Sequence, residues 1–281
     1  MTDAHRQHPL PHAREDRQTA RTVPDTPQTR NSAYRLAFVD EDFLCREELR
    51  PVRLQLELLK PALLMDEAEI TSTVVLFGGA RIPRPENRAD ARTQTLRDLT
   101  AQYDEARAFA RLVTEQSMAT SGGRENVIVT GGGPGVMEAG NRGAMDAGGR
   151  SIGLNIVLPH EQAPNEFVTP DLSFNFHYFA IRKMHFLVRA AAICVFPGGF
   201  GTLDELFEAL TLIQTGRMER VPFLLFGESF WRSIINWDAL QEAGTIGPDD
   251  LELFRFVDTA EDALALLKDW PHPRTRREWH R

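Results

Sequence analysis

One acidic and one basic side chain accompany a glycine-rich turn whose chemistry suits a phosphate. Three glycines fall within the four residues Gly198–Gly201, and Thr202 and Glu205 follow them. Such a turn lets backbone approach a ligand closely, and a helix beginning there aims free N–H groups at an anion. Upstream, Arg182 carries a planar guanidinium that suits phosphate, carboxylate or ribose hydroxyls. We therefore expect an anionic ligand at this turn, with phosphate the first candidate.

Glu205 has two interpretations. Thr202 and Glu205 have the Thr-x-x-Glu spacing of a capping box, in which the glutamate only satisfies a backbone donor. Spacing alone favours that interpretation. The apolar residues of 203–213 form the core face of the helix, however, so Glu205 points toward the mouth of the turn or into solvent. Both interpretations stay open on the sequence.

The helix expected over about residues 178–189 is apolar nearly all round, yet it carries Arg182, Lys183, His185 and Arg189. A helix of this kind is buried in a core or a subunit interface, where charges need partners. Structural ion pairs or snorkelling explain these charges as well as a cationic wall facing the glycine turns does. Arg182 is the candidate for such a wall.

Two other glycine turns follow apolar runs that read as strands. Gly78–Gly79 follows residues 73–77, and Gly131–Gly135 follows residues 126–130. Strands that are apolar runs and alternate with helices indicate an α/β fold: a doubly wound, mostly parallel, Rossmann-like sheet with helices on both faces. The carboxyl ends of its strands share one edge, so three turns could wrap one phosphate-bearing ligand.

The remaining elements follow from apolar periodicity. We expect helices near residues 96–113, 136–147, 206–213, 230–240 and 260–267, further strands at 151–158, 190–195, 221–226 and 254–257, and a looser segment at 172–176.

Common nucleotide motifs are absent. The dinucleotide fingerprint needs a third glycine where this chain has Val136, and no Gly-Lys-Ser/Thr sequence of the Walker type occurs. A tight turn chosen for packing remains the simple alternative for Gly131–Gly135. Four glycines and a proline opening a helix exceed what a turn requires.

Composition indicates an ordinary globular protein. The chain has 281 residues, of which 42% are hydrophobic and 26% charged, with a net charge of −8. This charge argues against a nucleic-acid-binding surface. Cys45 and Cys194 show no metal-ligand or disulfide pattern, and no apolar run approaches the ~20 residues that span a bilayer. We expect a cytoplasmic protein with no metal, cofactor, membrane or nucleic-acid partner.

Four segments are expected along the chain. Residues 1–32 have few large apolar side chains and should be disordered. Residues 33–70 form a helical preface in which prolines 51 and 61 should end or kink helices. Residues 71–270 form the Rossmann-like domain, and residues 271–281 a basic tail.

Taken together, three motifs resemble the "lonely guy" family of nucleoside 5′-monophosphate phosphoribohydrolases, in its longer bacterial branch. They are Gly131–Glu138 with Asn141–Ala144, then Arg182–Lys183, and finally Pro197–Glu205. The resemblance covers roughly residues 73–267. Family members activate cytokinins, and many are mislabelled lysine decarboxylases.

The resemblance implies hydrolysis of the N-glycosidic bond of AMP or an N6-modified AMP, giving free base and ribose 5-phosphate. It implies that Arg182 and Glu205 are the catalytic pair. It implies a homodimer or a higher homo-oligomer as well. The positions that it implies for the substrate, the phosphate included, are Gly79, Gly132, Gly133, Gly135, Met137, Glu138, Lys183, Gly198, Gly199, Gly201 and Thr202.

Two competing functions differ in chemistry. A pyridoxal-phosphate decarboxylase needs a site lysine. The chain has only Lys60, Lys183 and Lys268, and of these only Lys183 lies within the motifs. The other alternative is a non-catalytic carrier or sensor of a nucleotide or a phosphorylated cofactor, using the same turns. The presence of both Arg182 and Glu205 favours the enzyme.

Overall fold

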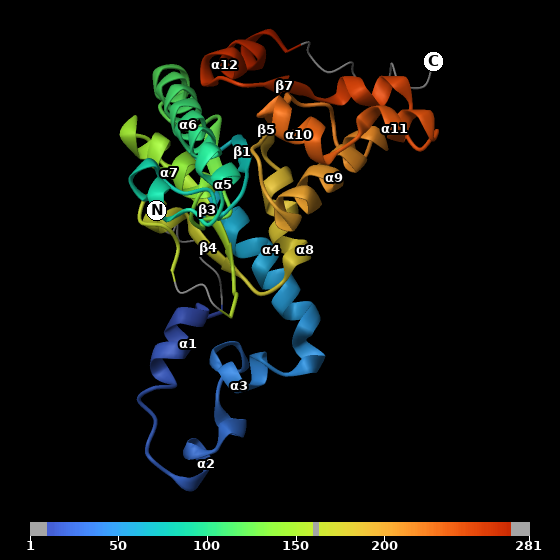
Figure 1. Cartoon of the computed structure of the whole chain (residues 1–281). Coiled ribbons are helices and arrows are strands. Elements are labelled where there is room, and N and C mark those ends of the chain that lie inside the picture. The colour runs from blue at the N-terminus through green and yellow to red at the C-terminus, as the bar shows by residue number, and fades with distance from the viewer. Residues whose placement is uncertain (1–9, 160–162, 271–281) are drawn as a thin grey trace. The chain divides into compact units, whose positions relative to one another are not determined.

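A computed structural model describes residues 10–159 and 163–270 of the chain, which divides into two units (Figure 1). Unit 1 holds Met1–Lys60 and unit 2 holds Pro61–Arg281. This division falls inside the helical preface expected at residues 33–70, and the boundaries of the expected segments stay a prediction. The basic tail at 271–281 lies outside the described residues.

Unit 1 consists of short helices. They are α1 (Ala13–Thr19), α2 (Pro27–Arg30), α3 (Glu41–Leu44) and the first part of α4 (Arg50–Glu67). Side-chain caps begin the first three, at His12, Thr26 and Asp40. Of the segment 1–32 that was expected to be disordered, residues 1–9 lie outside the described residues, and none of residues 10–32 is buried although α1 and α2 form there. The disorder of this segment stays a prediction.

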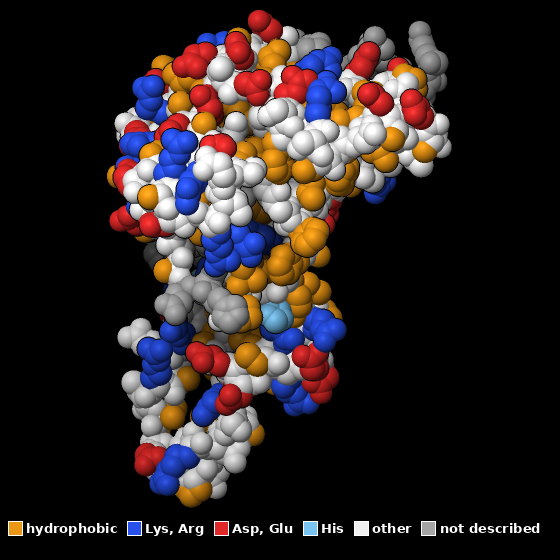
Figure 2. Space-filling view, viewed as in Figure 1, with side chains coloured by type: hydrophobic (Ala, Val, Ile, Leu, Met, Phe, Trp, Pro, Cys, Tyr) orange, Lys and Arg blue, Asp and Glu red, His pale blue; other side chains and the backbone are white. Residues whose placement is uncertain are grey.

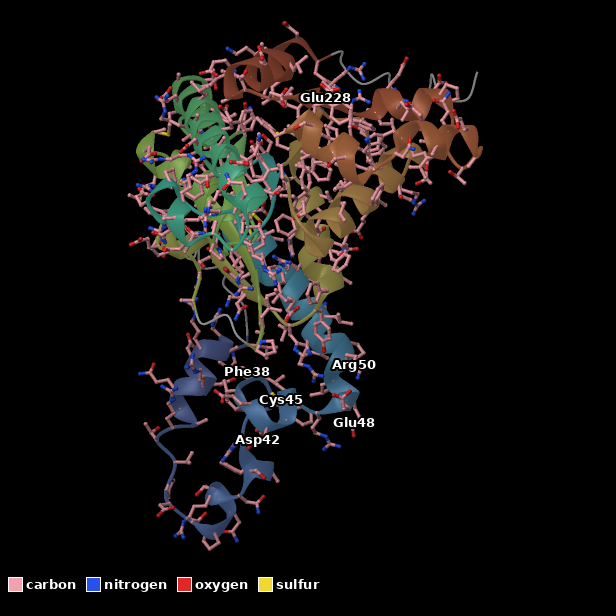
Figure 3. All side chains as sticks on the ribbon, viewed as in Figure 1. Phe38, Asp42, Cys45, Glu48, Arg50 and Glu228 are labelled. Carbon is pink, nitrogen blue, oxygen red and sulfur yellow. The ribbon has the colours of Figure 1, made fainter. Side chains whose placement is uncertain are left out.

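Two residues of the preface behave differently from one another. Pro51 occupies the second position of α4, where a missing N–H costs nothing. Pro61 lies inside the same helix, so it does not end the helix, and the alternative that it kinks the helix stays a prediction. Cys45 is exposed in unit 1 (Figure 3), whereas Cys194 is buried in unit 2.

Within the described residues, the strands of unit 2 form one seven-stranded sheet in the order β4-β3-β2-β1-β5-β6-β7. Every pairing is parallel, which confirms the doubly wound fold. The strands are β1 (Thr73–Phe77), β2 (Val127–Thr130), β3 (Ser151–Ile156), β4 (Ser173–Phe176), β5 (Ala190–Val195), β6 (Phe223–Phe226) and β7 (Arg255–Val257).

Two helical layers cover the sheet. The layer with α6, α7 and α12 packs on Val74 and Leu76 of β1, and the layer with α8, α9, α10 and α11 packs on Val75 and Phe77. All of β1 is therefore buried, as its unbroken apolar sequence indicated. The helices of unit 2 are α5 (Gln94–Asp98), α6 (Thr100–Ser121), α7 (Val136–Asp146), α8 (Phe179–Leu187), α9 (Phe200–Gln214), α10 (Glu228–Ile234), α11 (Trp237–Glu242) and α12 (Ala260–Asp269).

Besides the helix expected near residues 96–113, which is two helices, α5 and α6, that meet at Leu99, two elements differ from the expectation. The looser segment at 172–176 contains β4, the edge strand, whose alternating burial leaves it without a continuous apolar run. The single helix expected near 230–240 is two helices, because the backbone of Ile235 is extended and Asn236 caps α11. Neither difference affects the centre of the sheet.

Strand order reverses beside β1. The chain moves outward from β1 through β2 and β3 to β4, then crosses back to place β5 on the other side of β1. Ligands of such sheets bind outside the carboxyl ends of the strands at this switch point. The turns after β1 and β5 therefore meet where a ligand is expected.

The face of unit 2 seen in Figure 2 has an apolar region. Figure 2 shows apolar side chains gathered over α8 and α9, and the exposed ones on these helices include Phe179, Met184, Phe200 and Phe207.

In the part of the chain that the structure describes, no helix has the length and apolar character needed to cross a membrane.

Candidate active site

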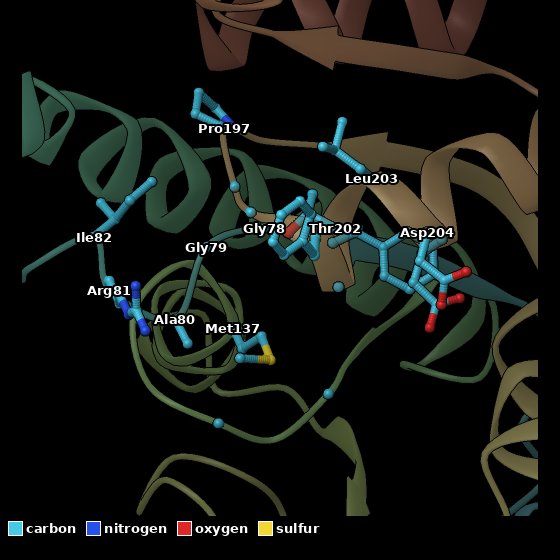
Figure 4. Close-up of a pocket in the computed structure, with 18 of the residues that line it drawn as sticks. Gly78, Gly79, Ala80, Arg81, Ile82, Met137, Pro197, Thr202, Leu203 and Asp204 are labelled. Atoms are coloured by element: carbon cyan, nitrogen blue, oxygen red, sulfur yellow. The ribbon is translucent and has the colours of Figure 1, made fainter. Parts of the chain in front are cut away.

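A cavity of about 720 Å³ lies at the switch point, and all three glycine turns line it. In Figure 4 the Gly78–Gly79 turn lies between Met137 and Pro197, while Arg81 and Asp204 mark opposite ends of the view. This volume falls within the range of ligand pockets in proteins. All three glycine turns line this single cavity, so they converge on one place as expected.

Backbone contacts fix the turns to one another. The N–H of Gly79 donates to the carbonyl of Pro197 at 2.9 Å, and the N–H of Val136 donates to the carbonyl of Gly79 at 3.3 Å. A Cβ on Gly135 would lie 2.3 Å from that carbonyl oxygen, and Gly135 has φ +71°. Only glycine allows this approach without strain. The turn after β2 is thus shaped by the turn after β1.

The start of α9 decides between the two interpretations of Glu205. The helix begins at Phe200 with Gly199 as its N-cap, and no side chain among the described residues caps it. Thr202 is therefore the third residue of the helix and cannot be its N-cap. The capping-box interpretation is wrong, because the three glycines let the backbone enter the helix earlier than the spacing indicated.

Glu205 is buried with an unused carboxylate. Its side chain is 8% exposed and lines the cavity. It makes no hydrogen bond or ion pair with any residue that the structure describes. Burial raises its pKa to about 7, although the nearby charges of Lys183 and Arg182 act to lower it. A buried acid with perturbed titration in a cleft is typical of a functional site.

Arg182 lies across one wall of the cavity. Its Nε donates to the carbonyl of Leu154 in β3 at 2.7 Å, and its guanidinium lies 5.2 Å from the ring centre of Phe186. A Cβ on Gly131 would lie 2.7 Å from Nη2, so this glycine makes room for the guanidinium. The structure thus brings Arg182 and Glu205 to the same cavity, and their role as a catalytic pair stays a prediction.

Lys183 is placed differently from its neighbour. Its ammonium lies 2.7 Å from Asp204 and 2.9 Å from Glu208, both on α9, and its side chain is 15% exposed. Burial acts to lower its pKa, but the two carboxylates outweigh burial and raise it. Lys183 is not among the residues that line the cavity. Nothing in this geometry supports substrate contact by Lys183.

Glu138 also lies outside the cavity lining. It accepts a hydrogen bond from the hydroxyl of Tyr103 at 2.7 Å and pairs with Arg84 at 3.3 Å. These contacts connect α7 to α6 and to the loop after β1. Glu138 is only 6% exposed, and its carboxylate is used in these contacts within the fold. Its geometry gives no support to the substrate role that the resemblance implied.

The other positions that the resemblance implied divide into two groups. Gly132 and Gly135 lie behind the cavity, where Gly132 donates to Thr130 Oγ1 at 3.0 Å and its carbonyl accepts from the N–H of Asn165 at 2.8 Å. They shape the turn instead of lining it. The positions that line the cavity are Gly79, Gly133, Met137, Gly198, Gly199, Gly201 and Thr202.

The sequence did not single out several lining residues. Arg81 follows the first glycine turn directly, which was the available signal for it, and Asp204 adjoins Glu205. Apolar side chains from separate elements complete the wall, and no local pattern connects them. They include Leu96, Leu99, Ile156, Leu158, Phe179, Phe186 and Phe230.

The described ranges contain no group of three or more His, Cys, Asp or Glu side chains arranged to hold a metal ion. The protein is thus a Rossmann-like α/β protein with a cavity for a small molecule at its switch point.

Residues 137–267 match a family model described as "Possible lysine decarboxylase". The cytokinin riboside 5′-monophosphate phosphoribohydrolase LOG3 of Arabidopsis thaliana is 26% identical over 148 residues, covering 52% of this chain and 67% of that protein. A phosphoribohydrolase of the same description from Mycobacterium tuberculosis (strain ATCC 25618 / H37Rv) is 28% identical over 159 residues, covering 54% and 82%. These matches confirm the resemblance to the lonely guy family.

Among solved structures, the molybdenum cofactor binding protein from the phototrophic bacterium Rippkaea orientalis is 18% identical with a TM-score of 0.47. The likeness covers 71% of this chain and 96% of that one.

Proposed function

We propose that this protein hydrolyses the N-glycosidic bond of a nucleoside 5′-monophosphate, AMP or an N6-modified AMP, giving free base and ribose 5-phosphate. The observation that carries the proposal is Glu205, a buried carboxylate that lines the cavity and makes no hydrogen bond to a described residue. Relatives named as phosphoribohydrolases, one plant and one bacterial, supply the reaction class.

The phosphate is assigned to the turn that opens α9. Gly199 and Gly201 line the cavity, and a Cβ at either position would meet nothing within 4 Å, so open space lies above their backbone. Free N–H groups and the positive end of the helix dipole favour an anion there. The ribose then extends toward Glu205, one helical turn further along.

The reaction needs a group that stabilises positive charge on the sugar. As the bond from C1′ to the base nitrogen breaks, its electron pair leaves with the base and C1′ becomes oxocarbenium-like. The ionised Glu205 stabilises that charge and orients a water molecule, whose oxygen bonds to C1′. The elements of that water are shared between ribose 5-phosphate and the protonated base. Arg182, which also lines the cavity, anchors the substrate.

Decarboxylase chemistry receives no support from the site. Such an enzyme needs a lysine amine that faces the cofactor pocket and can lose its proton. Lys183 is held in ion pairs by Asp204 and Glu208, which raise its pKa. A lysine held in this way is poorly suited to form an imine, and Lys183 does not line the cavity.

The test is direct. The protein is incubated with a panel of nucleoside 5′-monophosphates, and free base and ribose 5-phosphate are both quantified. We expect stoichiometric release of the two products by the parent protein and not by Glu205→Gln. Tight binding of a nucleotide without release of base would instead favour the carrier alternative.

We also propose a cytoplasmic homodimer. The exposed apolar side chains of α8 and α9, with Phe200 93% exposed, form a surface that a second copy would cover. Light scattering in solution measures the mass directly. A monomer at concentrations where the protein is active would contradict the dimer.

A further inference from the structure

A single ammonium joins two carboxylates that flank Glu205. Lys183 comes from α8, and its Nζ lies 2.7 Å from Oδ2 of Asp204 and 2.9 Å from Oε2 of Glu208. The two carboxylates are four residues apart on α9 and therefore lie on one face of the helix. Lys183 thus fixes α8 against the first turns of α9.

Three carboxylates crowd this part of α9. Asp204, Glu205 and Glu208 lie within five residues, and like charges on neighbouring positions disfavour ionisation. The charged groups that act on Glu205 are Lys183 and Arg182 from α8, and Glu208 and Asp204 from α9 itself. Of the two cations, Lys183 has the larger effect on Glu205. It also neutralises the two carboxylates that oppose ionisation.

We propose that Lys183 is a positioning residue for catalysis: held between Asp204 and Glu208, its ammonium favours the ionised form of the neighbouring Glu205 carboxylate in a buried site. This role differs from the substrate contact that the resemblance implied for Lys183. It rests on the proposed function only in assigning catalysis to Glu205. The electrostatic part is independent of any substrate.

Removal of the ammonium has a double consequence. Lys183→Met takes away the cation with the larger effect on Glu205 and leaves Asp204 and Glu208 without their shared partner. Both changes make ionisation of Glu205 harder, so they act in the same direction. We expect the midpoint of Glu205 ionisation to rise by about one pH unit, at the low end for a neighbouring opposite charge. Lys183→Arg keeps the charge and should restore most of the shift.

The first experiment measures Glu205 without any substrate. Protein labelled with ¹³C at glutamate carboxyls is titrated by NMR, and the signal of Glu205 is assigned by its loss in Glu205→Gln. Lys268→Met is the matched control, because this exposed lysine lies on α12 away from the cavity. An unchanged Glu205 midpoint in Lys183→Met, or an equal rise in Lys183→Arg, overturns the proposal.

The second experiment measures the reaction. The acidic limb of the kcat profile should move to higher pH in Lys183→Met, with about a tenfold loss at pH 6 and little loss at pH 9. A raised KM with an unmoved limb would return Lys183 to substrate contact and overturn the proposal. If the parent cleaves no nucleotide while the NMR midpoint shifts as expected, the proposed function fails and the electrostatic role of Lys183 stands.

Discussion

The starts of α7 and α9 have the same motif, but the glutamate in each has different surroundings. Each helix follows a buried strand and a glycine turn, and each carries a buried glutamate near its start, Glu138 and Glu205. Glu138 is engaged by Tyr103 and Arg84, outside the cavity lining. Glu205 lines the cavity with no hydrogen bond to a described residue.

Burial therefore does not identify the functional acid. The two side chains are almost equally buried, at 6% and 8% exposed. They differ in partners, since a carboxylate whose lone pairs are used stabilises the fold and one whose lone pairs face a cavity remains available to a ligand. The same turn and helix can thus supply an anchor in one place and a reactive group in another.

The largest expected effect is on turnover by Glu205→Gln. The substitution keeps the shape of the side chain and removes the negative charge that stabilises the oxocarbenium-like sugar. We expect kcat to fall by about 10³-fold, the scale of losing one preorganised electrostatic group. Product release from AMP or an N6-modified AMP, followed by chromatography, is the measurement.

Glu138→Gln is the matched control, with the same chemical change at the start of the other helix. We expect it to reduce kcat far less than Glu205→Gln does. Equal losses in the two variants would remove the distinction between the two glutamates.

Glu205→Gln should increase the stability of the protein, although it lowers turnover. Glu205, with its pKa raised to about 7, binds a proton more tightly in the folded state than in the unfolded state. Its contribution to stability is therefore lost as pH rises from the unfolded value of about 4.5 through 7. At pH 8 Glu205→Gln should be more stable than the parent by about 3 kcal/mol, a gain that shrinks toward pH 5.

Glu138→Gln should instead lose about 2 kcal/mol, because it weakens hydrogen bonds of a buried charged group. Urea unfolding of both variants at pH 5 and pH 8 checks the two signs. A stability loss in Glu205→Gln at pH 8 would show that its carboxylate is engaged in the fold after all.

The sequence was sufficient for the central strands of the sheet and for the edge where the cavity lies. Unbroken apolar runs at 73–77 and 190–195 predicted the central strands, and glycine turns directly after them predicted the ligand-binding edge. The edge strand β4 was missed because its burial alternates, and the break at Ile235 was missed because a local extended residue has no periodic signal. Central elements are predictable from composition, while edge elements depend on their tertiary contacts.

The partners of charged side chains were not predictable. Glu138, Lys183 and Arg182 all belong to family motifs, yet their partners come from α6, α9 and β3, far away in sequence. The capping-box pattern at Thr202 misled because helix entry depends on the backbone of Gly199, which a spacing rule does not include. Spacing thus proposes candidate residues, and partner geometry decides their roles.

We expect the glycines at the starts of α7 and α9 to differ in role, as the two glutamates do: one affects substrate binding and the other affects stability. Gly201 faces open cavity, so Gly201→Ala should leave folding intact and place a methyl group in the phosphate site. We expect KM for the nucleotide to rise by about tenfold, the scale of one methyl group in a binding pocket. Gly135→Ala, with φ +71° and a Cβ 2.3 Å from the Gly79 carbonyl, should mainly destabilise the fold, by about 1–3 kcal/mol.

Calorimetry of both variants, with steady-state kinetics on the same samples, makes this comparison. An unchanged KM in Gly201→Ala would place the phosphate at the start of α7 instead.

The smallest effect is the pH dependence near neutrality. Glu205 acts in its ionised form, and burial raises its pKa to about 7, so kcat should rise with pH through that value. At pH 7 only about half of the molecules are ionised, so turnover should be about twofold below its value at pH 9. Bound phosphate adds negative charge nearby and pushes the midpoint in the complex upward, so kcat should show a higher midpoint than kcat/KM. A kcat/KM profile that is flat from pH 5 to pH 9 would mean that no group like Glu205 limits the reaction, and the start of α9 would then be no more reactive than the start of α7.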